Sequence, residues 1–240
     1  MKNLSFASTL YIMSIILAGL VLVGWTATKV DWTNISLYLL SALGAVAQTL
    51  KLEGPNNRTN YSIAWFVYGF AFLALGPAAA ILVAVISHLV EWIWHKYPWY
   101  IQTFNIGNHV ISLFLAGLVF NAMSHGTPIL DLARATGLAA ANLVFVLGNH
   151  GFVGLVVRLA RGQSFEESGV FGFLTLFLDF TVLSMGTVTA LLWAYSPFAS
   201  VLNILPLYLL YEALRVPALK RQVEEMKRMR GQLQLDASGD

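Results

Sequence analysis

Residues 77–122 read PAAAILVAVISHLVEWIWHKYPWYIQTFNIGNHVISLFLAGLVFNA, two apolar stretches joined by an aromatic turn at Tyr97-Pro98. Each stretch is close to the roughly 20 mainly apolar residues that a helix needs to cross a bilayer. Neither shows the alternation of polar and apolar residues that is typical of membrane-barrel strands. The stretch therefore predicts a hairpin of two transmembrane helices, and the rest of the chain follows the same pattern.

The composition of the whole chain agrees with a membrane protein. Its 240 residues are 58% hydrophobic and 11% charged, whereas a soluble domain is about 45–50% apolar and about 25% charged. Such a chain has too little polar surface to cover a water-soluble globule, so we expect the lipid bilayer as its partner. The absence of cysteine excludes a disulfide-stapled secreted domain. A net charge of +2 without a basic face argues against a nucleic-acid partner.

Eight apolar stretches predict an all-α, polytopic transmembrane bundle of about eight spans over residues 1–214. Turn residues such as Gly76-Pro77 and Ser196-Pro197 separate the stretches. Six or seven spans are the alternatives, because residues 61–76 are few and residues 196–214 contain Pro206. The expected spans are residues 7–26, 34–50, 61–76, 77–95, 102–122, 132–157, 170–194 and 196–214.

The cations predict the orientation of the bundle. If both termini are cytoplasmic, 12 of the 14 Lys and Arg residues lie on the cytoplasmic side, and only Lys29 and Arg134 lie outside. The positive-inside rule favours this orientation over the reverse. Tryptophan and tyrosine gather around the turn at residues 92–100, as expected where a helix end meets the membrane interface. We therefore expect both termini in the cytoplasm.

Ionisable and amide side chains within the predicted spans form the candidate site, because such groups are costly in a membrane. His88 and His109 each lie about ten residues from the Tyr97-Pro98 turn, which places both about 15 Å from the cytoplasmic boundary. His150 and Asp179 are roughly equally far, in residues, from the next cytoplasmic turn at residues 162–164. We therefore expect one polar layer near the midplane, made of His88, Glu91, Asn105, His109, His150, Asp179 and Asn203.

Three interpretations of this layer remain open. The side chains join neighbouring helices by hydrogen bonds, or line a cavity for a small ligand, proton or ion. In the third interpretation, His88, His109 and His150 hold a metal or a haem. His88 and Glu91 share a helix face at a spacing of three residues, but no local metal-binding motif is present. The sequence names no cofactor, and without a recognisable catalytic motif we expect no enzymatic activity.

Residues 215–240 predict a short cytoplasmic helix and tail. They carry six Lys and Arg against four Asp and Glu, so the net charge of the chain resides there. This helix either rests its cations on anionic lipid headgroups, or dimerises or binds a cytoplasmic signalling partner. Its partner-binding candidates form a partly apolar stripe at heptad-like spacing: Leu219, Val223, Met226 and Leu233.

The order of several short motifs is the basis for a family resemblance. Tyr61-Ser62 opens a span that ends in 75–80, Leu-Gly-Pro-Ala-Ala-Ala; the aromatic turn 94–100 and Phe104-Asn105 follow, and later come residues 161–164, Arg-Gly-Gln-Ser, and Leu205-Pro206. This order resembles the multi-pass, membrane-associated sensor regions that precede GGDEF or HD-GYP output domains in bacterial signalling proteins. The resemblance covers most of residues 30–235. The given residues depart from the pattern because they stop after the tail helix, so we expect either a piece cut at the domain boundary or a stand-alone relative of these sensor regions.

The resemblance implies an input module of the bacterial inner (plasma) membrane that senses a cue and relays it through the tail helix. The alternative function is a small-molecule transporter component, namely a substrate-binding membrane subunit, because such subunits are also small helical bundles with polar groups near the midplane. A haem- or metal-binding membrane protein is the third hypothesis.

Overall fold

A computed structural model of the chain describes residues 4–50, 52–53, 60–124 and 131–238. Within these residues the fold is helical apart from two short strands, β1 (Leu52–Glu53) and β2 (Asn60–Tyr61), which pair antiparallel. The expected all-α class is confirmed. The helices are α1 (Phe6–Ala27), α2 (Ile35–Thr49), α3 (Ala64–Ala74), α4 (Pro77–His95), α5 (Trp99–Ser124), α6 (Leu132–Arg161), α7 (Phe165–Ser168), α8 (Phe173–Tyr195), α9 (Pro197–Val201) and α10 (Ile204–Ser238).

Five of the described helices are long and apolar enough to cross a membrane, namely α1, α4, α5, α6 and α8. They indicate a multi-pass membrane protein. The apolar helices α2 and α3 and the segment Pro197–Ala213 are shorter. The 11 residues of α3 rise only about 16 Å, close to half the thickness of the hydrocarbon core. The sequence therefore predicts more spans than the helix lengths alone support.

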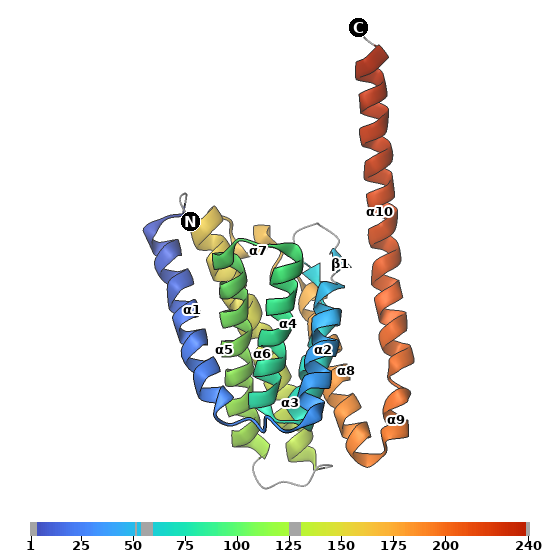
Figure 1. Cartoon of the computed structure of the whole chain (residues 1–240). Helices are drawn as coiled ribbons and strands as arrows, with labels where there is room; N and C mark the ends of the chain where they lie inside the picture. The colour runs from blue at the N-terminus through green and yellow to red at the C-terminus, as the bar shows by residue number, and fades with distance from the viewer. Residues whose placement is uncertain (1–3, 51, 54–59, 125–130, 239–240) are drawn as a thin grey trace.

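The last predicted span differs most from the structure. Residues 196–214 form a short helix, α9, a break at Leu202-Asn203, and the first part of α10. Pro197 starts α9, a position where proline is well tolerated because its missing N–H is not needed. From Ile204, α10 continues without interruption through residues 214 and 215, where the sequence predicts the end of the bundle. Figure 1 shows α10 extending past the other helices on the side of the N-terminus.

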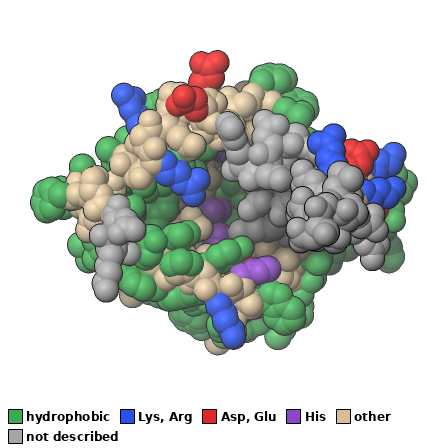
Figure 2. Space-filling model, turned by 90° about the horizontal axis from the view of Figure 1, so that it is seen from above, with side chains coloured by type: hydrophobic (Ala, Val, Ile, Leu, Met, Phe, Trp, Pro, Cys, Tyr) green, Lys and Arg blue, Asp and Glu red, His purple; other side chains and the backbone are tan. Residues whose placement is uncertain are grey.

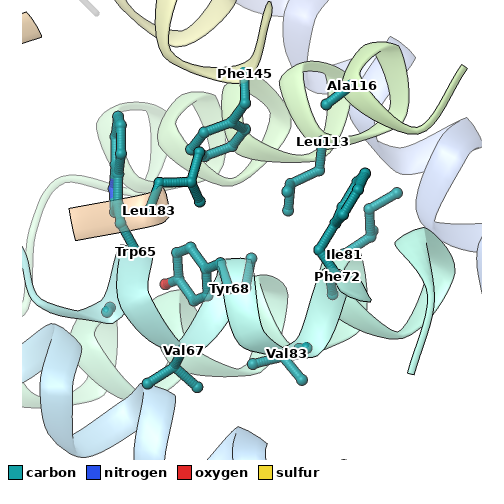
Figure 3. Close-up of a cluster of buried hydrophobic side chains, with 14 of the residues drawn as sticks. Trp65, Val67, Tyr68, Phe72, Ile81, Val83, Leu113, Ala116, Phe145 and Leu183 are labelled. Atoms are coloured by element: carbon teal, nitrogen blue, oxygen red, sulfur yellow. The ribbon is translucent and has the colours of Figure 1, made fainter. Parts of the chain in front are cut away.

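The core of the bundle is built around α3. Successive helices run up and down between two ends of the molecule, and α3 lies among them (Figure 1). Ala64, Tyr68 and Ala71 are fully buried, and the aromatic side chains of α3 meet residues of α4, α5, α6 and α8 (Figure 3). A helix that is apolar on all sides is expected to be buried in this way. Its short length is therefore compatible with a central position.

Glycines allow two of these helices to approach backbone to backbone. A methyl group added at Gly69 of α3 would collide with the carbonyl oxygen of Leu183, and one added at Gly186 of α8 would collide with that of Phe66. Between membrane helices, where lipid removes most of the hydrophobic driving force, such close packing is a main source of association. The α3–α8 contact therefore depends on the absence of a side chain at both glycines.

Turn chemistry fixes two of the helix ends predicted from the sequence. Gly76 has φ 93°, a left-handed conformation that glycine adopts without steric cost, and Pro77 begins α4 directly after it. Gly162 ends α6 with φ 69°. These residues reverse the chain in a few residues, and the flanking helices become antiparallel neighbours.

The glycine contact gives the first prediction. Gly186→Ala forces α3 and α8 apart and should lower the unfolding free energy in detergent by about 1–3 kcal/mol. Gly24→Ala is the matched control, because an added methyl there meets nothing within 4 Å; helix propensity makes it neutral or slightly stabilising. Thermal unfolding of the purified variants measures both effects. Equal midpoints for the two variants would contradict this account of the contact.

Candidate functional site

A cavity of about 220 Å³ lies among the helices, and most of the residues that line it are polar. It receives side chains from α2, α3, α4, α5, α6 and α8. Viewed from the end of the bundle that carries the N-terminus, Figure 2 shows a central hollow in which histidine side chains are visible. The lining residues are Gln48, Ser62, Trp65, His88, Asn105, Asn108, His109, Asn149, His150, Val153, Val170, Thr175 and Asp179.

Five of the seven residues predicted for the polar layer line this cavity: His88, Asn105, His109, His150 and Asp179. Glu91 lies directly beside it, hydrogen-bonded to His88. His109 is ten residues into α5 and Asp179 six residues into α8, so the two lie about 15 and 9 Å from those helix ends. The layer thus lies between one end of the bundle and its middle.

Asn203 corrects the expected layer, because the structure does not bring it to the cavity. Its Nδ2 donates to Thr189 Oγ1 at 3.0 Å. Thr189 is ten residues beyond Asp179 on α8, about 15 Å further along the helix axis. The sequence prediction assumed a regular helix through residues 196–214. Since α9 and the break after it occupy the start of that segment, Asn203 remains near the opposite end.

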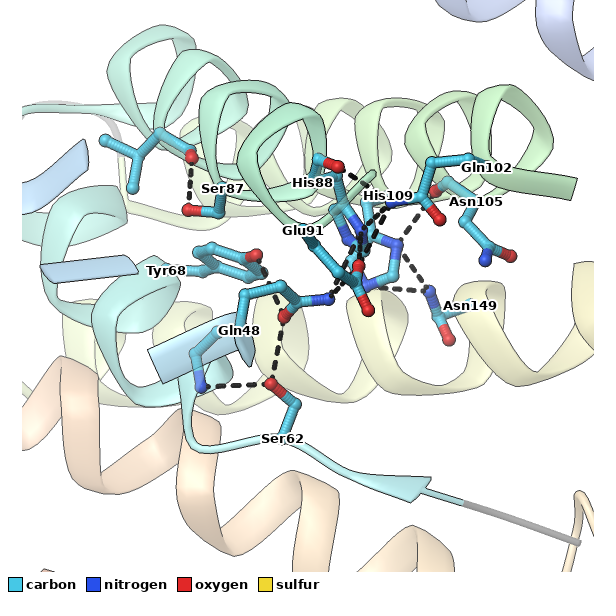
Figure 4. Close-up of polar contacts among 12 residues, drawn as sticks. Gln48, Ser62, Tyr68, Ser87, His88, Glu91, Gln102, Asn105, His109 and Asn149 are labelled. Carbon is cyan, nitrogen blue, oxygen red and sulfur yellow. Dashed lines mark hydrogen bonds and ion pairs between the residues drawn. The ribbon is translucent and has the colours of Figure 1, made fainter. Parts of the chain in front are cut away.

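Glu91 is the centre of a buried hydrogen-bond network (Figure 4). Its Oε2 accepts from Gln48 Nε2 at 3.0 Å, from Gln102 Nε2 at 3.0 Å and from His88 Nδ1 at 3.1 Å. These donors come from α2, α5 and α4, and all four side chains are buried. The carboxylate therefore ties three helices together. Its charge also reaches the α4–α5 turn, where burial first and Glu91 second raise the pKa of Tyr97.

Gln48 extends this network to the start of α3. Its Oε1 accepts from the hydroxyl of Ser62 at 2.9 Å and from that of Tyr68 at 3.4 Å. Because a carboxylate only accepts hydrogen bonds, the amide nitrogen of Gln48 faces Glu91 and its oxygen faces the hydroxyls. The orientation of this side chain is thus fixed by its partners.

A second pair joins α6 and α8 on another wall of the cavity. His150 Nε2 and Asp179 Oδ2 are 2.8 Å apart, and both side chains are less than one-tenth exposed. On α5, His109 Nδ1 donates to the backbone oxygen of Asn105 at 2.9 Å. The amide nitrogen of Asn149 lies 3.4 and 3.5 Å from the two ring nitrogens of His109. Polar contacts therefore continue across the cavity from α5 to α8.

Aromatic rings bring the three histidines close together. The ring centroids of His88 and His109 are 4.4 Å apart, and Trp65 lies 6.0 Å from His109 and 6.1 Å from His150. Even so, the described part of the chain contains no group of three or more His, Cys, Asp or Glu arranged to hold a metal ion. The geometry of these residues gives the metal interpretation no support.

The seven-residue layer predicted from the sequence leaves out four polar residues at or beside the cavity: Gln48, Gln102, Asn108 and Asn149. The two asparagines are among the amides that the sequence places within the predicted spans, whereas the two glutamines were not considered. The two glutamines carry no charge and stand alone in apolar stretches, yet a buried amide needs partners as a charged group does. The two asparagines belong to a signal that is present in the sequence. Residues 107–109 and 148–150 both read Gly-Asn-His, on neighbouring helices that run in opposite directions. This repeat could have identified Asn108 and Asn149 together with His109 and His150.

Comparison of the chain with protein-family models, curated proteins and solved structures yields no match. The resemblance to bacterial sensor regions thus stays an expectation from the sequence. Function has to be argued from the cavity and from the helices that position its side chains.

The His150–Asp179 pair gives the second prediction. His150→Leu leaves the buried carboxyl group without its 2.8 Å partner and should cost about 3 kcal/mol of unfolding free energy. The double variant His150→Leu, Asp179→Leu should lose less unfolding free energy than the two single variants lose together, because it contains no carboxyl group left without a partner. Denaturant unfolding of both single variants and the double variant measures the coupling.

Asn203→Ala and Thr189→Ala provide the matched control cycle at the other end of α8. An ordinary hydrogen bond between membrane helices contributes about 0.6 kcal/mol, so their coupling should be much smaller. Strictly additive effects at His150 and Asp179 would show that the pair contributes nothing as a unit.

Proposed function

We propose that this chain is a sensor and interaction module of the bacterial inner membrane, which binds a small polar ligand in the cavity and relays its presence through α10. The observation that carries the proposal is the convergence of polar side chains from α2, α4, α5, α6 and α8 on one open space of about 220 Å³. Hydrogen bonds that only join helices leave no such space, since the partners meet directly. A ligand explains both the polar walls and the volume between them.

The relay rests on the position of α8. This helix carries Asp179 at the cavity and, ten residues later, Thr189, whose hydroxyl accepts a hydrogen bond from Asn203 just before α10. A shift of α8 on ligand binding would therefore move the start of α10. Beyond the bundle, Val223 and Met226 are 44% and 57% exposed, and we propose that they contact a second copy or a cytoplasmic partner. The side chains of Leu219 and Leu233, proposed for the same surface, lie outside the described ones.

The proposed topology has eight passages through the membrane and both termini in the cytoplasm. Three passages use segments shorter than 18 residues, namely α2, α3 and the segment Pro197–Ala213. Neighbouring helices cover α3, most of whose residues are buried, whereas the segment Pro197–Ala213 is largely exposed, with Phe198 at 88% and Leu202 at 74%. Lys96, Arg158 and Arg161 follow or end helices at the end of the bundle assigned to the cytoplasm, while Lys29 and Arg134 belong to the other end.

A transporter component is the second candidate function. The cavity opens toward one end of the bundle (Figure 2), as a substrate site does in one of its two access states. Transport additionally requires a conformation that is open to the other side. Uptake of a bound compound into proteoliposomes would favour transport, and binding without uptake would favour sensing.

The binding proposal gives the third prediction. In a thermal-unfolding screen of amines, amino acids, nucleobases, sugars and carboxylates, at least one class should raise the midpoint of the purified full chain. Asn149→Leu, which replaces a polar wall by an apolar side chain of similar size, should abolish that shift. Asn203→Leu, outside the cavity, should retain it. If no compound class stabilises the protein, or if the shift survives Asn149→Leu, the cavity is not a ligand site.

The topology gives the fourth prediction, which the cysteine-free sequence makes simple to test. Thr33→Cys lies in the exposed connection between α1 and α2, and Glu224→Cys lies on an exposed part of α10. A membrane-impermeant maleimide should label Thr33→Cys in intact spheroplasts and Glu224→Cys only after lysis. The reverse pattern, or labelling of both from outside, contradicts the proposed orientation.

A further inference from the structure

We infer that the ligand of the cavity is a compact organic cation with N–H donors, a protonated amine or guanidine, held at the carboxylate of Asp179. The inference rests on the proposed function and deepens it by naming the ligand class. It follows from the hydrogen-bonding groups on the cavity walls, taken one at a time. The amide donors of Gln48 and Asn108 are used by the protein, whereas the indole N–H of Trp65 and the side-chain amide of Asn105 form no hydrogen bond within the described residues. The other wall groups that are left over are acceptors, apart from the hydroxyl of Thr175.

Two amide donors are used in internal bonds. Gln48 Nε2 donates to Glu91 at 3.0 Å, and Asn108 Nδ2 donates to the backbone oxygen of Asn149 at 3.3 Å. Carboxylate and carbonyl oxygens only accept, so the amide nitrogens are assigned without ambiguity. The matching amide oxygens are also engaged: that of Gln48 by Ser62, and that of Asn108 by Ser112.

The orientation of Asn149 follows from His109. Because the backbone oxygen of Asn105 can only accept, His109 Nδ1 carries the proton of that 2.9 Å bond. The amide nitrogen of Asn149 lies 3.4 Å from Nδ1 and 3.5 Å from Nε2. In the neutral imidazole only Nε2 can accept, so Nε2 is the hydrogen-bond partner of this amide nitrogen. The remaining group of Asn149 is its side-chain oxygen. This acceptor has no protein donor within the described residues.

The His150–Asp179 pair leaves two more acceptors. His150 Nε2 donates to Asp179 Oδ2 at 2.8 Å, so in the neutral imidazole Nδ1 is a lone pair. The second carboxylate oxygen of Asp179 forms no further hydrogen bond with the described part of the chain. Thr175, also on the wall, adds a hydroxyl that can donate or accept. A ligand that satisfies this set must supply hydrogens.

Charge and size narrow the class further. Asp179 is a buried carboxylate in a membrane bundle, and its described partner, His150, contacts only one of its two oxygens. Among the described residues that line the cavity, none is Lys or Arg. An anionic ligand would therefore meet the carboxylate without compensation, whereas a cation pairs with it. The volume of about 220 Å³ is below the range of about 300–1,000 Å³ typical of drug-sized ligands, so the cation must be compact.

The experiment uses the purified full chain in detergent at constant ionic strength. Three probes are titrated by calorimetry: methylguanidinium chloride, N-methylurea and sodium acetate. N-methylurea closely matches methylguanidinium in shape but has no charge, and acetate has the opposite charge. Methylguanidinium should bind at least tenfold more tightly than N-methylurea, and acetate should bind most weakly.

Two test variants and one control variant connect the binding to Asp179. Asp179→Asn keeps the shape of the side chain and removes its charge, and it should weaken methylguanidinium at least tenfold. Asp31→Asn makes the same chemical change at a residue in the exposed connection between α1 and α2, and it should leave binding unchanged. Thr175→Val is the second test, for the case in which Asp179→Asn fails to fold. It removes a hydroxyl without changing volume and should weaken binding by a smaller factor.

Several results would overturn the inference and still be distinguishable from failure of the proposed function. N-methylurea or acetate binding as tightly as methylguanidinium would show a ligand site of another class. A ligand site of another class would also follow if none of the three probes binds while another compound class raises the unfolding midpoint and Asn149→Leu abolishes that shift. Unchanged methylguanidinium affinity in folded Asp179→Asn and Thr175→Val would place the cation elsewhere.

Discussion

A polar group buried in a membrane bundle must find its partner within the protein, because lipid offers none. Glu91 meets this requirement with donors from α2, α4 and α5, and Asp179 meets it with His150 across α6 and α8. These contacts fix how the helices are rotated and which faces meet. The remaining structure can be understood as the packing that this constraint allows.

In that packing, glycines allow close approach of helices and large aromatic side chains fill the space between them. Gly69 and Gly186 let α3 and α8 touch through their backbones, and the aromatic residues of α3 then fill the centre of the bundle. Because α3 is short and begins beside the cavity, Trp65 is placed between the histidines of α5 and α6. The apolar core and the polar cavity are thus two consequences of one central helix.

Much of the fold could be predicted from the sequence, because runs of apolar residues and turn residues are local signals. Each expected span contains a helix, and Gly76-Pro77 and Gly162 end helices where turn chemistry indicates. The last segment could not be predicted in this way, since the break at Asn203 and the continuation of α10 have no strong local signal. Height along a hairpin identified His88, His109, His150 and Asp179, but it gave the wrong position for Asn203.

By itself, the sequence determined the solvent, the helical class and the depth of most polar side chains, because these follow from composition and from a rise of about 1.5 Å per residue. The tertiary structure alone decided which of those side chains face one another. It recruited Gln48 and Gln102 to Glu91 and oriented Asn149 toward His109. The rotation of each helix about its axis is set by contacts with neighbouring helices, and the amino-acid sequence does not state which residues make those contacts.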